Sequence, residues 1–536
     1  MTREAGERRA SLSRPPAALV LVCLVTNLAE AGVAVGLGIA GGAAIAPQAA
    51  APPPLALFGD LRWLLVYERS WTTFALGAGA LLALRSSVTA LQARLAWPGP
   101  KPPFGRLAAR AALANVALGA LLAPFALLLY GFGAFPVSWL YFAAVPSVVV
   151  LALLLHEASL SSAWWRHAPG LRPAAWTALT ALVLTAAAGL VSLDPVALAL
   201  PVAALAGLFE ALAWRRIVTA VASRPVRRFA PLAPLFALSF VAGALLGAAA
   251  GFSAARVPPS APAGEAAPEA LRGRQVVLLA TGFASHYEGA PATLAAAPRR
   301  ARVVRFSYRG STGSGAPLPY PASATRASLA HLERLMARQV DELARASGRP
   351  VDIVAVSEGS AIVEAYLAAT PRPPVGTVVL VSPLLDPGAV GYPPAGRDGW
   401  GMVAGRGLAV LSSWLAPIST VDLSPNQPFL RSLLADHLRP AAPPPCAPRC
   451  QTIRELAVIP LADAVTGALP RWRGVESVVV PAFHSGDLAD PAVRAVVAEA
   501  LEGRRVVADP AESTLARVIG SLAAAWRVPA LAPGLS

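Results

Sequence analysis

The chain has 536 residues, of which 55% are hydrophobic and only 14% are charged. Soluble globular domains carry about 25% charged residues, so this composition predicts a membrane protein and argues against a wholly soluble one. The formal net charge of +15 comes almost entirely from arginines, and these fall between apolar segments. Because they form no stripe, they indicate membrane topology rather than nucleic-acid binding.

The first half of the chain, residues 1–253, is predicted to be a membrane domain. A basic tail, residues 1–16, precedes seven apolar segments, each close to the ~20 residues that cross a bilayer as a helix. These segments are 17–40, 71–92, 109–133, 137–155, 174–193, 196–214 and 231–253. The first segment could instead be a cleaved signal peptide, since it has a basic start and is followed by small residues, although its apolar run is long for that role.

Arginine and lysine alternate between successive connections. They are concentrated in the N-terminal tail and in the loops near 93–110, 156–173 and 215–230, whereas the intervening connections carry only Arg62 and Arg69. The positive-inside rule therefore predicts a cytoplasmic N-terminus and, after seven crossings, an extracytoplasmic C-terminal half. A cleaved signal peptide would leave this expectation for the C-terminal half unchanged.

Three charged residues, Glu30, Arg85 and Glu210, fall inside or at the edge of these segments. Intramembrane charges can mark a path for a substrate or a proton. Alternatively, Arg85 and Glu210 could extend toward the membrane surface and keep their charges in water. For Glu30, with Asn27 one turn earlier, the sequence leaves both interpretations open.

Residues 254–273 are rich in Ala, Pro, Ser and Glu and are predicted to be a linker, followed by an α/β domain at 274–503 and a C-terminal tail at 504–536. Apolar runs separated by helical patterns predict a mostly parallel sheet. The expected strands are 275–280, 302–308, 351–355, 376–381, 452–459 and 475–480, and the expected helices include 324–346 and 490–501.

Ser357 stands between the strand at 351–355 and a helix that begins at Glu358. Its Ala-x-Ser-x-Gly context is the nucleophile-elbow pattern G-x-S-x-G with the first glycine replaced by Ala355. Small residues are needed there because the serine must stand on a tight, strained turn. The backbone N–H of Glu358, at a helix N-terminus, could donate to a developing oxyanion.

A serine nucleophile needs a general base and a group that orients the base. His484 follows the final apolar strand, and Asp463 follows the strand before it, where a carboxylate should sit beside His484. Asp386, which follows an earlier strand, is the rival acid. The second oxyanion donor is expected after the first strand, at the backbone N–H of Phe283.

Residues 275–502 resemble an α/β-hydrolase of the lipase or esterase kind, through the stretches 278–283, 306–310, 353–359 and 422–430 and the segments around Asp463 and His484. The chain departs from the family at Thr281, where histidine is usual, at Ala355, and at Glu358, where a neutral residue or histidine is common. This resemblance implies hydrolysis of an ester through an acyl-enzyme, with no metal or organic cofactor. A lipid or small acyl ester is the expected substrate; acyl transfer and a purely binding role remain alternatives.

Residues 383–451 form a long insertion between two strands. The resemblance implies a cap over an acyl pocket, while an ordinary helical excursion with its own small core is the alternative. The chain's three cysteines, Cys23, Cys446 and Cys450, cannot build a zinc site. Two of them, Cys446 and Cys450, lie in this insertion among prolines, and we expect a disulfide there if the domain faces an oxidising compartment.

Overall fold

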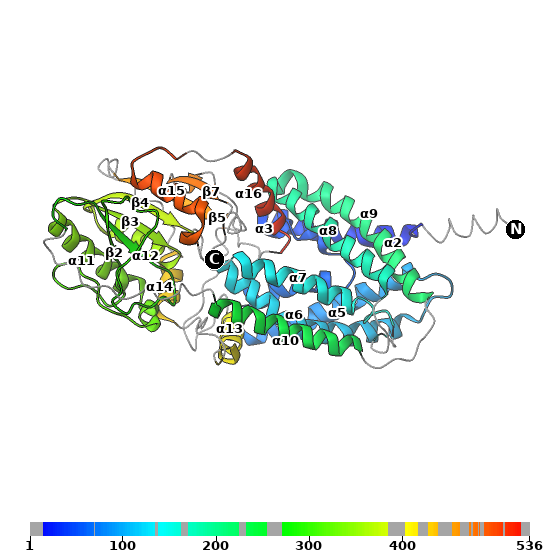
Figure 1. Cartoon of the computed structure of the whole chain (residues 1–536). Helices are drawn as coiled ribbons and strands as arrows, with labels where there is room; N and C mark the ends of the chain where they lie inside the picture. The colour runs from blue at the N-terminus through cyan, green and yellow to red at the C-terminus, as the bar shows by residue number, and fades with distance from the viewer. Residues whose placement is uncertain are drawn as a thin grey trace.

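A bundle of long helices is followed by an α/β domain (Figure 1). The computed structural model describes residues 14–68, 70–134, 138–161, 164, 170–223, 232–254, 271–383, 402–415, 417, 427–437, 453–460, 471–472, 475–480, 482, 487–506 and 510–526. The predicted fold class, a multi-span helical membrane domain followed by a mostly parallel α/β domain, is confirmed.

Every apolar segment predicted to cross the membrane forms a helix. These helices are α2 (Ala17–Gly36), α5 (Trp71–Ala96), α6 (Phe104–Ala134), α7 (Ser138–Leu155), α8 (Leu171–Leu193), α9 (Pro195–Ala222) and α10 (Leu232–Ala254). Within the described residues, five helices are long and apolar enough to span a bilayer: α2, α5, α6 as far as Leu128, α8 and α9. The described apolar stretches of α7 and α10 are shorter, at Val145–Leu155 and Pro234–Gly247.

The helices that border the arginine-rich connections meet at one end of the bundle. The start of α2, the end of α5, the start of α6 and the end of α9 share a buried cluster there that includes Leu19, Leu107 and Trp214. The Arg215 guanidinium of α9 donates to the Ala96 carbonyl at the end of α5, at 2.7 Å. The α/β domain lies at the opposite end (Figure 1).

Between α2 and α5 the chain turns back into the bundle, a feature that the sequence did not reveal. This re-entrant segment contains α3 (Ala40–Ala43), the 3₁₀ turn η1 (Ala46–Gln48) and α4 (Leu55–Tyr67). The Ala50 N–H donates to Asn27 Oδ1 of α2 at 2.8 Å, and its carbonyl accepts from Gln92 of α5 at 3.2 Å and Trp214 of α9 at 2.9 Å. Non-helical backbone within a membrane needs such partners because lipid offers none.

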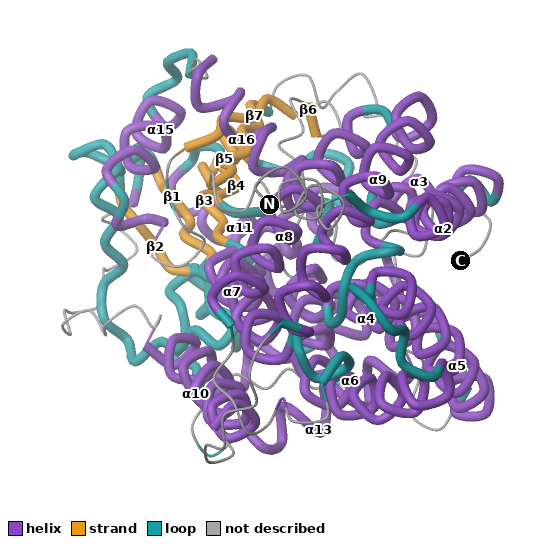
Figure 2. The backbone as a smooth tube through the Cα atoms, turned by 90° about the vertical axis from the view of Figure 1, so that its right-hand side faces the viewer, coloured by secondary structure: helices purple, strands orange, loops and turns teal. Residues whose placement is uncertain are grey.

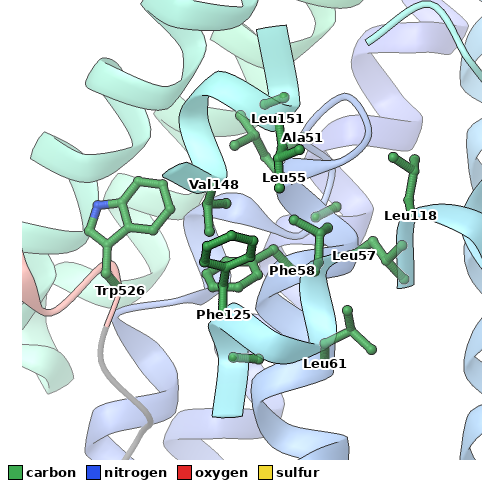
Figure 3. Close-up of a cluster of buried hydrophobic side chains, with 14 of the residues drawn as sticks. Ala51, Leu55, Leu57, Phe58, Leu61, Leu118, Phe125, Val148, Leu151 and Trp526 are labelled. Atoms are coloured by element: carbon green, nitrogen blue, oxygen red, sulfur yellow. The ribbon is translucent and has the colours of Figure 1, made fainter. Parts of the chain in front are cut away.

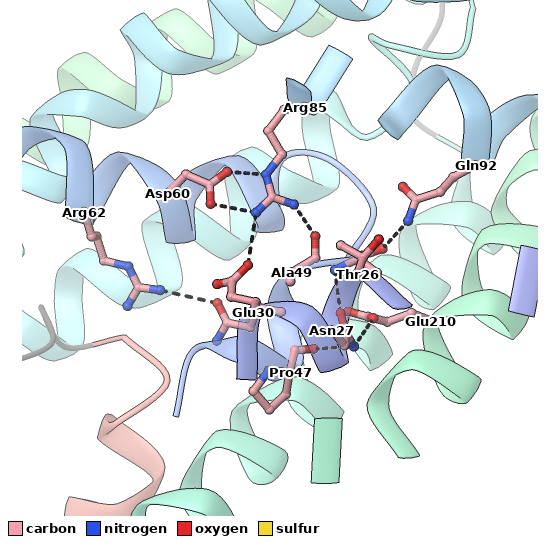
Figure 4. A network of polar contacts seen from close by, with 12 residues as sticks. Thr26, Asn27, Glu30, Pro47, Ala49, Asp60, Arg62, Arg85, Gln92 and Glu210 are labelled. Carbon is pink, nitrogen blue, oxygen red and sulfur yellow. Dashed lines mark hydrogen bonds and ion pairs between the residues drawn. The ribbon is translucent and has the colours of Figure 1, made fainter. Parts of the chain in front are cut away.

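Charged side chains surround this segment inside the bundle (Figure 4). Arg85 pairs with Asp60 through two bonds, one of them Nη2 to Oδ1 at 2.6 Å, and it lies 3.6 Å from a Glu30 carboxylate oxygen. Glu210 accepts from Asn27 Nδ2 at 2.7 Å. Because Arg85 and Glu210 are both buried, the alternative in which they extend toward the membrane surface is wrong.

The α/β domain is built on one sheet of seven strands in the order β2-β1-β3-β4-β5-β7-β6. The strands are β1 (Val276–Ala280), β2 (Arg302–Arg305), β3 (Val351–Val356), β4 (Val375–Val381), β5 (Arg454–Pro460), β6 (Arg471–Trp472) and β7 (Val475–Val480). All neighbouring pairs are parallel except β6 with β7. The six strands predicted from sequence are present; the short edge strand β6 was not predicted.

Helices cover both faces of this sheet (Figure 2). On one face, α11 (Leu329–Ser347) and α12 (Glu358–Ala369) bury Leu332 and Ile362 against Leu278. On the other, α15 (Pro491–Leu501) buries Val497 against Val277 and its neighbours. Burial on both faces explains why β1 and β4 are almost continuous apolar runs instead of alternating ones.

Two helices that follow the sheet strands in sequence return to the bundle. From the insertion, α13 (Met402–Leu415) packs on α4 and α6, where its Leu408 joins the cluster that holds Phe125. After the α/β domain, α16 (Pro510–Ala523) packs along α8, and Trp526 beyond it enters the same cluster (Figure 3). The described part of the insertion therefore has no core of its own: α13 uses that of the bundle, and α14 (Pro428–His437) packs on α11.

Candidate active site

Ser357 occupies a strained turn between β3 and α12. Its backbone has φ +52° and ψ −115°, a conformation that L-residues rarely adopt outside functional sites. The turn is fixed on both sides: the Ser357 N–H donates to the Val381 carbonyl of β4 at 3.0 Å, and its carbonyl accepts from Ser360 N at 2.9 Å and Oγ at 2.5 Å. The side chain is half-buried at the carboxyl edge of the sheet.

The small residues that flank Ser357 are required by space. A Cβ atom at Gly359 would lie 2.7 Å from the Ala280 carbonyl oxygen of β1, which is closer than real Cβ atoms approach. On the other side, Ala355 is fully buried and lies opposite Ala280 in the parallel register. The expectation that small residues are needed at these positions is confirmed for Gly359, while the methyl of Ala355 is accommodated.

The loop after β1 borders Ser357. A Cβ atom at Gly282 would lie 3.2 Å from Ser357 Cβ and 3.6 Å from its Oγ, so this glycine leaves room over the hydroxyl. Phe283, the candidate oxyanion donor, comes next and is half-buried, with its ring 6.3 Å from that of Phe429 in α14. An oxyanion hole needs N–H donors within hydrogen-bonding distance of the reacting oxygen, and this loop passes close to the Ser357 hydroxyl.

Glu358 is buried beside the turn, and burial raises the pKa of its carboxyl well above the ordinary value of 4.5. Its Oε2 lies 3.4 Å from Tyr308 Oη, which itself donates to the Thr281 carbonyl at 2.5 Å. The Tyr308 hydroxyl is thus shared between the Thr281 carbonyl and the Glu358 carboxyl, to which it donates. The raised pKa of the buried carboxyl favours its neutral form, which adds no negative charge next to the Glu358 N–H.

This chain of contacts, from Glu358 through Tyr308 to Thr281, anchors the loop that carries Phe283. Tyr308 is 2% exposed, and burial raises its pKa well above the ordinary value. Sequence reasoning missed Tyr308, although it lies in one of the stretches that resemble the hydrolase family. The only signal was an unusual acid after the serine, which needs a buried partner.

The other proposed catalytic side chains, Asp463, His484 and the rival Asp386, lie outside the described residues. The strands before them are described: β5 pairs directly with β7, with Pro460 opposite Val480. The chain leaves both strands at the edge of the sheet where Ser357 stands, because all of these strands are parallel. As expected, the strand before Asp463 is the neighbour of the strand before His484.

The remaining predicted features are partly described. Cys446 and Cys450 lie outside the described residues, and Cys23 is a buried free thiol in α2. Within the described part of the chain, no three His, Cys, Asp or Glu side chains are grouped to hold a metal ion.

No protein-family model matches the chain, no curated protein is similar to it in sequence, and no solved structure matches it.

Proposed function

We propose that this protein is a membrane-tethered serine hydrolase that cleaves an ester through an acyl-enzyme. The observation that carries the proposal is the strained turn at Ser357, which holds a hydroxyl at the carboxyl edge of a parallel sheet with a glycine loop over it. Maintaining φ +52° at a serine costs about 1–3 kcal/mol, a cost that proteins tend to accept at functional sites.

In the proposed reaction, Ser357 Oγ attacks the ester carbonyl carbon while His484 accepts the hydroxyl proton. The N–H groups of Phe283 and Glu358 stabilise the oxyanion, and the alcohol leaves with the proton that His484 returns. Water then attacks the acyl-enzyme by the same route and releases the acid. Asp463 orients His484 throughout.

A lipid-derived acyl ester is the substrate class that suits a site joined to a membrane domain. Acyl transfer to an alcohol would use the same residues, and identification of the acylated product distinguishes it from hydrolysis. A domain that only binds a partner is the remaining alternative, and it would not react with an active-site probe.

The catalytic proposal is tested with a fluorophosphonate probe on the full-length protein. We expect Ser357→Ala to abolish labelling and to lower ester turnover by about 10³-fold or more, as loss of a triad nucleophile does. Ser347→Ala, at a buried serine at the end of α11, is the matched control and should label normally. Unchanged labelling of the Ser357 variant would refute the proposed nucleophile.

We also propose that the α/β domain is extracytoplasmic and the N-terminus cytoplasmic. The support is that the arginine-rich connections border one end of the bundle and the α/β domain lies at the other. A membrane-impermeant thiol reagent, applied to intact cells after reduction, should label Cys446 and Cys450, whereas without reductant a disulfide between them should prevent it. Labelling only after the cells are opened would place the domain in the cytoplasm.

A further inference from the structure

The helix α13 belongs to the insertion of the α/β domain, yet it lies against the membrane domain. One of its faces is buried on α4 and α6, through Val403, Ala404 and Leu408. The contact is close, because a Cβ atom at Gly407 would lie 2.7 Å from a methyl carbon of Leu127. The outward face of α13 therefore lies at the same depth along the bundle as Leu127, and it has the same surroundings as the bundle at that depth.

The position of Leu127 along α6 gives that level. Arg110 is the last basic residue at the start of α6, and Leu127 follows it by 17 residues, which corresponds to a rise of about 26 Å. The hydrocarbon layer of a bilayer is about 30 Å thick, so with Arg110 at one boundary Leu127 lies near the other, on the side of the α/β domain. With 14 residues, α13 is about 21 Å long and too short to cross the membrane itself.

The outward face of α13 has the composition of a helix that lies in the membrane interface. Arg406, Val410, Ser413 and Trp414 follow one another at helical spacing and are all exposed, with Val410 at 50% and Trp414 at 74%. Tryptophan is enriched at the level of the lipid headgroups, and an arginine there can reach lipid phosphates. Water would be a poor environment for the Trp414 indole, whereas the interface suits it.

The same insertion also reaches the candidate active site. Its second described helix, α14, carries the fully buried Phe429, whose ring lies 6.3 Å from that of Phe283. The Ser432 hydroxyl of α14 accepts from the Leu329 N–H at the start of α11, at 2.7 Å. One insertion therefore contacts both the membrane domain and the loop that borders Ser357.

We propose that α13 lies in the membrane interface on the side of the α/β domain, and that the active site takes its ester from that leaflet. The substrate would then be a lipid ester resident in the bilayer instead of an ester dissolved in water. The part concerning the substrate rests on the proposed hydrolase function, whereas the lipid contact of α13 does not.

The origin of the substrate is tested by measuring turnover of two esters by the full-length protein in phospholipid vesicles. One is a fluorogenic diacylglycerol ester embedded in the bilayer, and the other is the water-soluble 4-nitrophenyl acetate. We expect Val410→Asp and Trp414→Asp each to lower turnover of the lipid ester by about 10-fold, which corresponds to about 1.4 kcal/mol, because a charged side chain disfavours contact of the outward face of α13 with lipid. Turnover of the soluble ester should stay within about twofold. Arg338→Asp on the exposed face of α11 is the matched control and should affect neither ester.

Lipid contact is measured without reference to activity by a phospholipid that carries a diazirine in its acyl chain. After illumination, the α13 peptide should be labelled, as should the exposed lipid-facing residues Leu113 and Val116 of α6. Labelling of α6 without α13 would overturn the interfacial position. An equal loss of turnover of both esters in the α13 variants would contradict entry of the substrate from the membrane. A wild-type protein that cleaves neither ester and does not react with the fluorophosphonate probe would refute the hydrolase function itself.

Discussion

Glu358 combines two features at one residue: its backbone N–H is a proposed oxyanion donor, and its side chain is buried. A charged carboxylate there would oppose the developing negative charge, but burial raises its pKa and so favours the neutral carboxyl. The acid that departs from the hydrolase pattern is thus compatible with an oxyanion at the site. Burial of this carboxyl should therefore lower the stability of the fold instead of weakening the stabilisation of the oxyanion.

The pH dependence of stability tests this state of Glu358. Because its folded-state pKa is raised above 4.5, the folded protein retains a proton that the unfolded chain loses, so the protein should lose stability as pH rises above about 4.5. Glu358→Gln does not titrate, so the variant should gain stability relative to the wild type between about pH 5 and pH 8. The gain is limited to about 1.4 kcal/mol per pH unit.

Denaturant unfolding of the detergent-solubilised protein at both pH values measures this difference. Glu476→Gln, at an exposed carboxylate on β7, is the control and should show no such trend. A difference between Glu358→Gln and the wild type that does not change with pH would mean that Glu358 is already ionised in the fold.

At the scale of elements, the strands were predictable because each one leaves a direct trace in the sequence. Strands buried on both faces must be apolar throughout, which is why β3 and β4 were recognised nearly to the residue. The turn at Ser357 was predictable for a similar reason, since Gly359 is dictated by contact with Ala280.

The re-entrant segment and the position of α13 were not predictable in this way. Pro52, Pro53 and Pro54 interrupt the apolar pattern before α4, so a segment that returns into the bundle resembles an ordinary connection. The apolar face of α13 could be buried within the insertion itself or against another helix, because its partner is distant in sequence. Only the tertiary structure shows that α6 packs against this face.

The order of strands also bears on which acid orients His484. The strand before Asp463, β5, is the direct neighbour of β7, whereas β4, before Asp386, is one strand further away. We therefore expect Asp463→Asn to lower ester turnover by about 10³-fold or more, because the histidine would lose its orienting carboxylate. Asp386→Asn should have a much smaller effect in the same assay, and the reverse ranking would move the acid to the end of β4.

At the scale of the whole molecule, the α/β domain is held to the bundle at several places. Besides the connection after α10 and the contact of α13, the segment 524–526 that follows α16 inserts into the bundle beside the re-entrant segment. The Ala525 carbonyl accepts from Arg62 Nη1 at 2.8 Å and from Gln48 Nε2 at 3.0 Å. Both donors are buried, so the last described residues complete the polar interior of a membrane domain that begins some 500 residues earlier in the sequence.

Trp526 provides the apolar part of this attachment. It is 6% exposed, its ring lies 6.1 Å from that of Phe58 in α4, and its indole N–H donates to Thr185 Oγ1 of α8 at 3.1 Å (Figure 3). Trp526→Ala would leave a cavity between α4 and α8 and remove one hydrogen bond to the Thr185 hydroxyl. Loss of a buried aromatic side chain typically costs 3–5 kcal/mol, which is a large share of the stability of one domain.

We therefore expect Trp526→Ala to lower the midpoint of thermal unfolding of the detergent-solubilised protein by several degrees, whereas Val518→Ala, at an exposed residue of α16, should change it little. Because Trp526 contacts the bundle, the loss of stability should first make the re-entrant segment, including α4, sensitive to protease, while the sheet stays resistant. Equal midpoints of thermal unfolding for the two variants would mean that residues 524–526 contact the bundle without stabilising it. Early cleavage confined to the α/β domain would instead mean that the inserted residues stabilise the sheet.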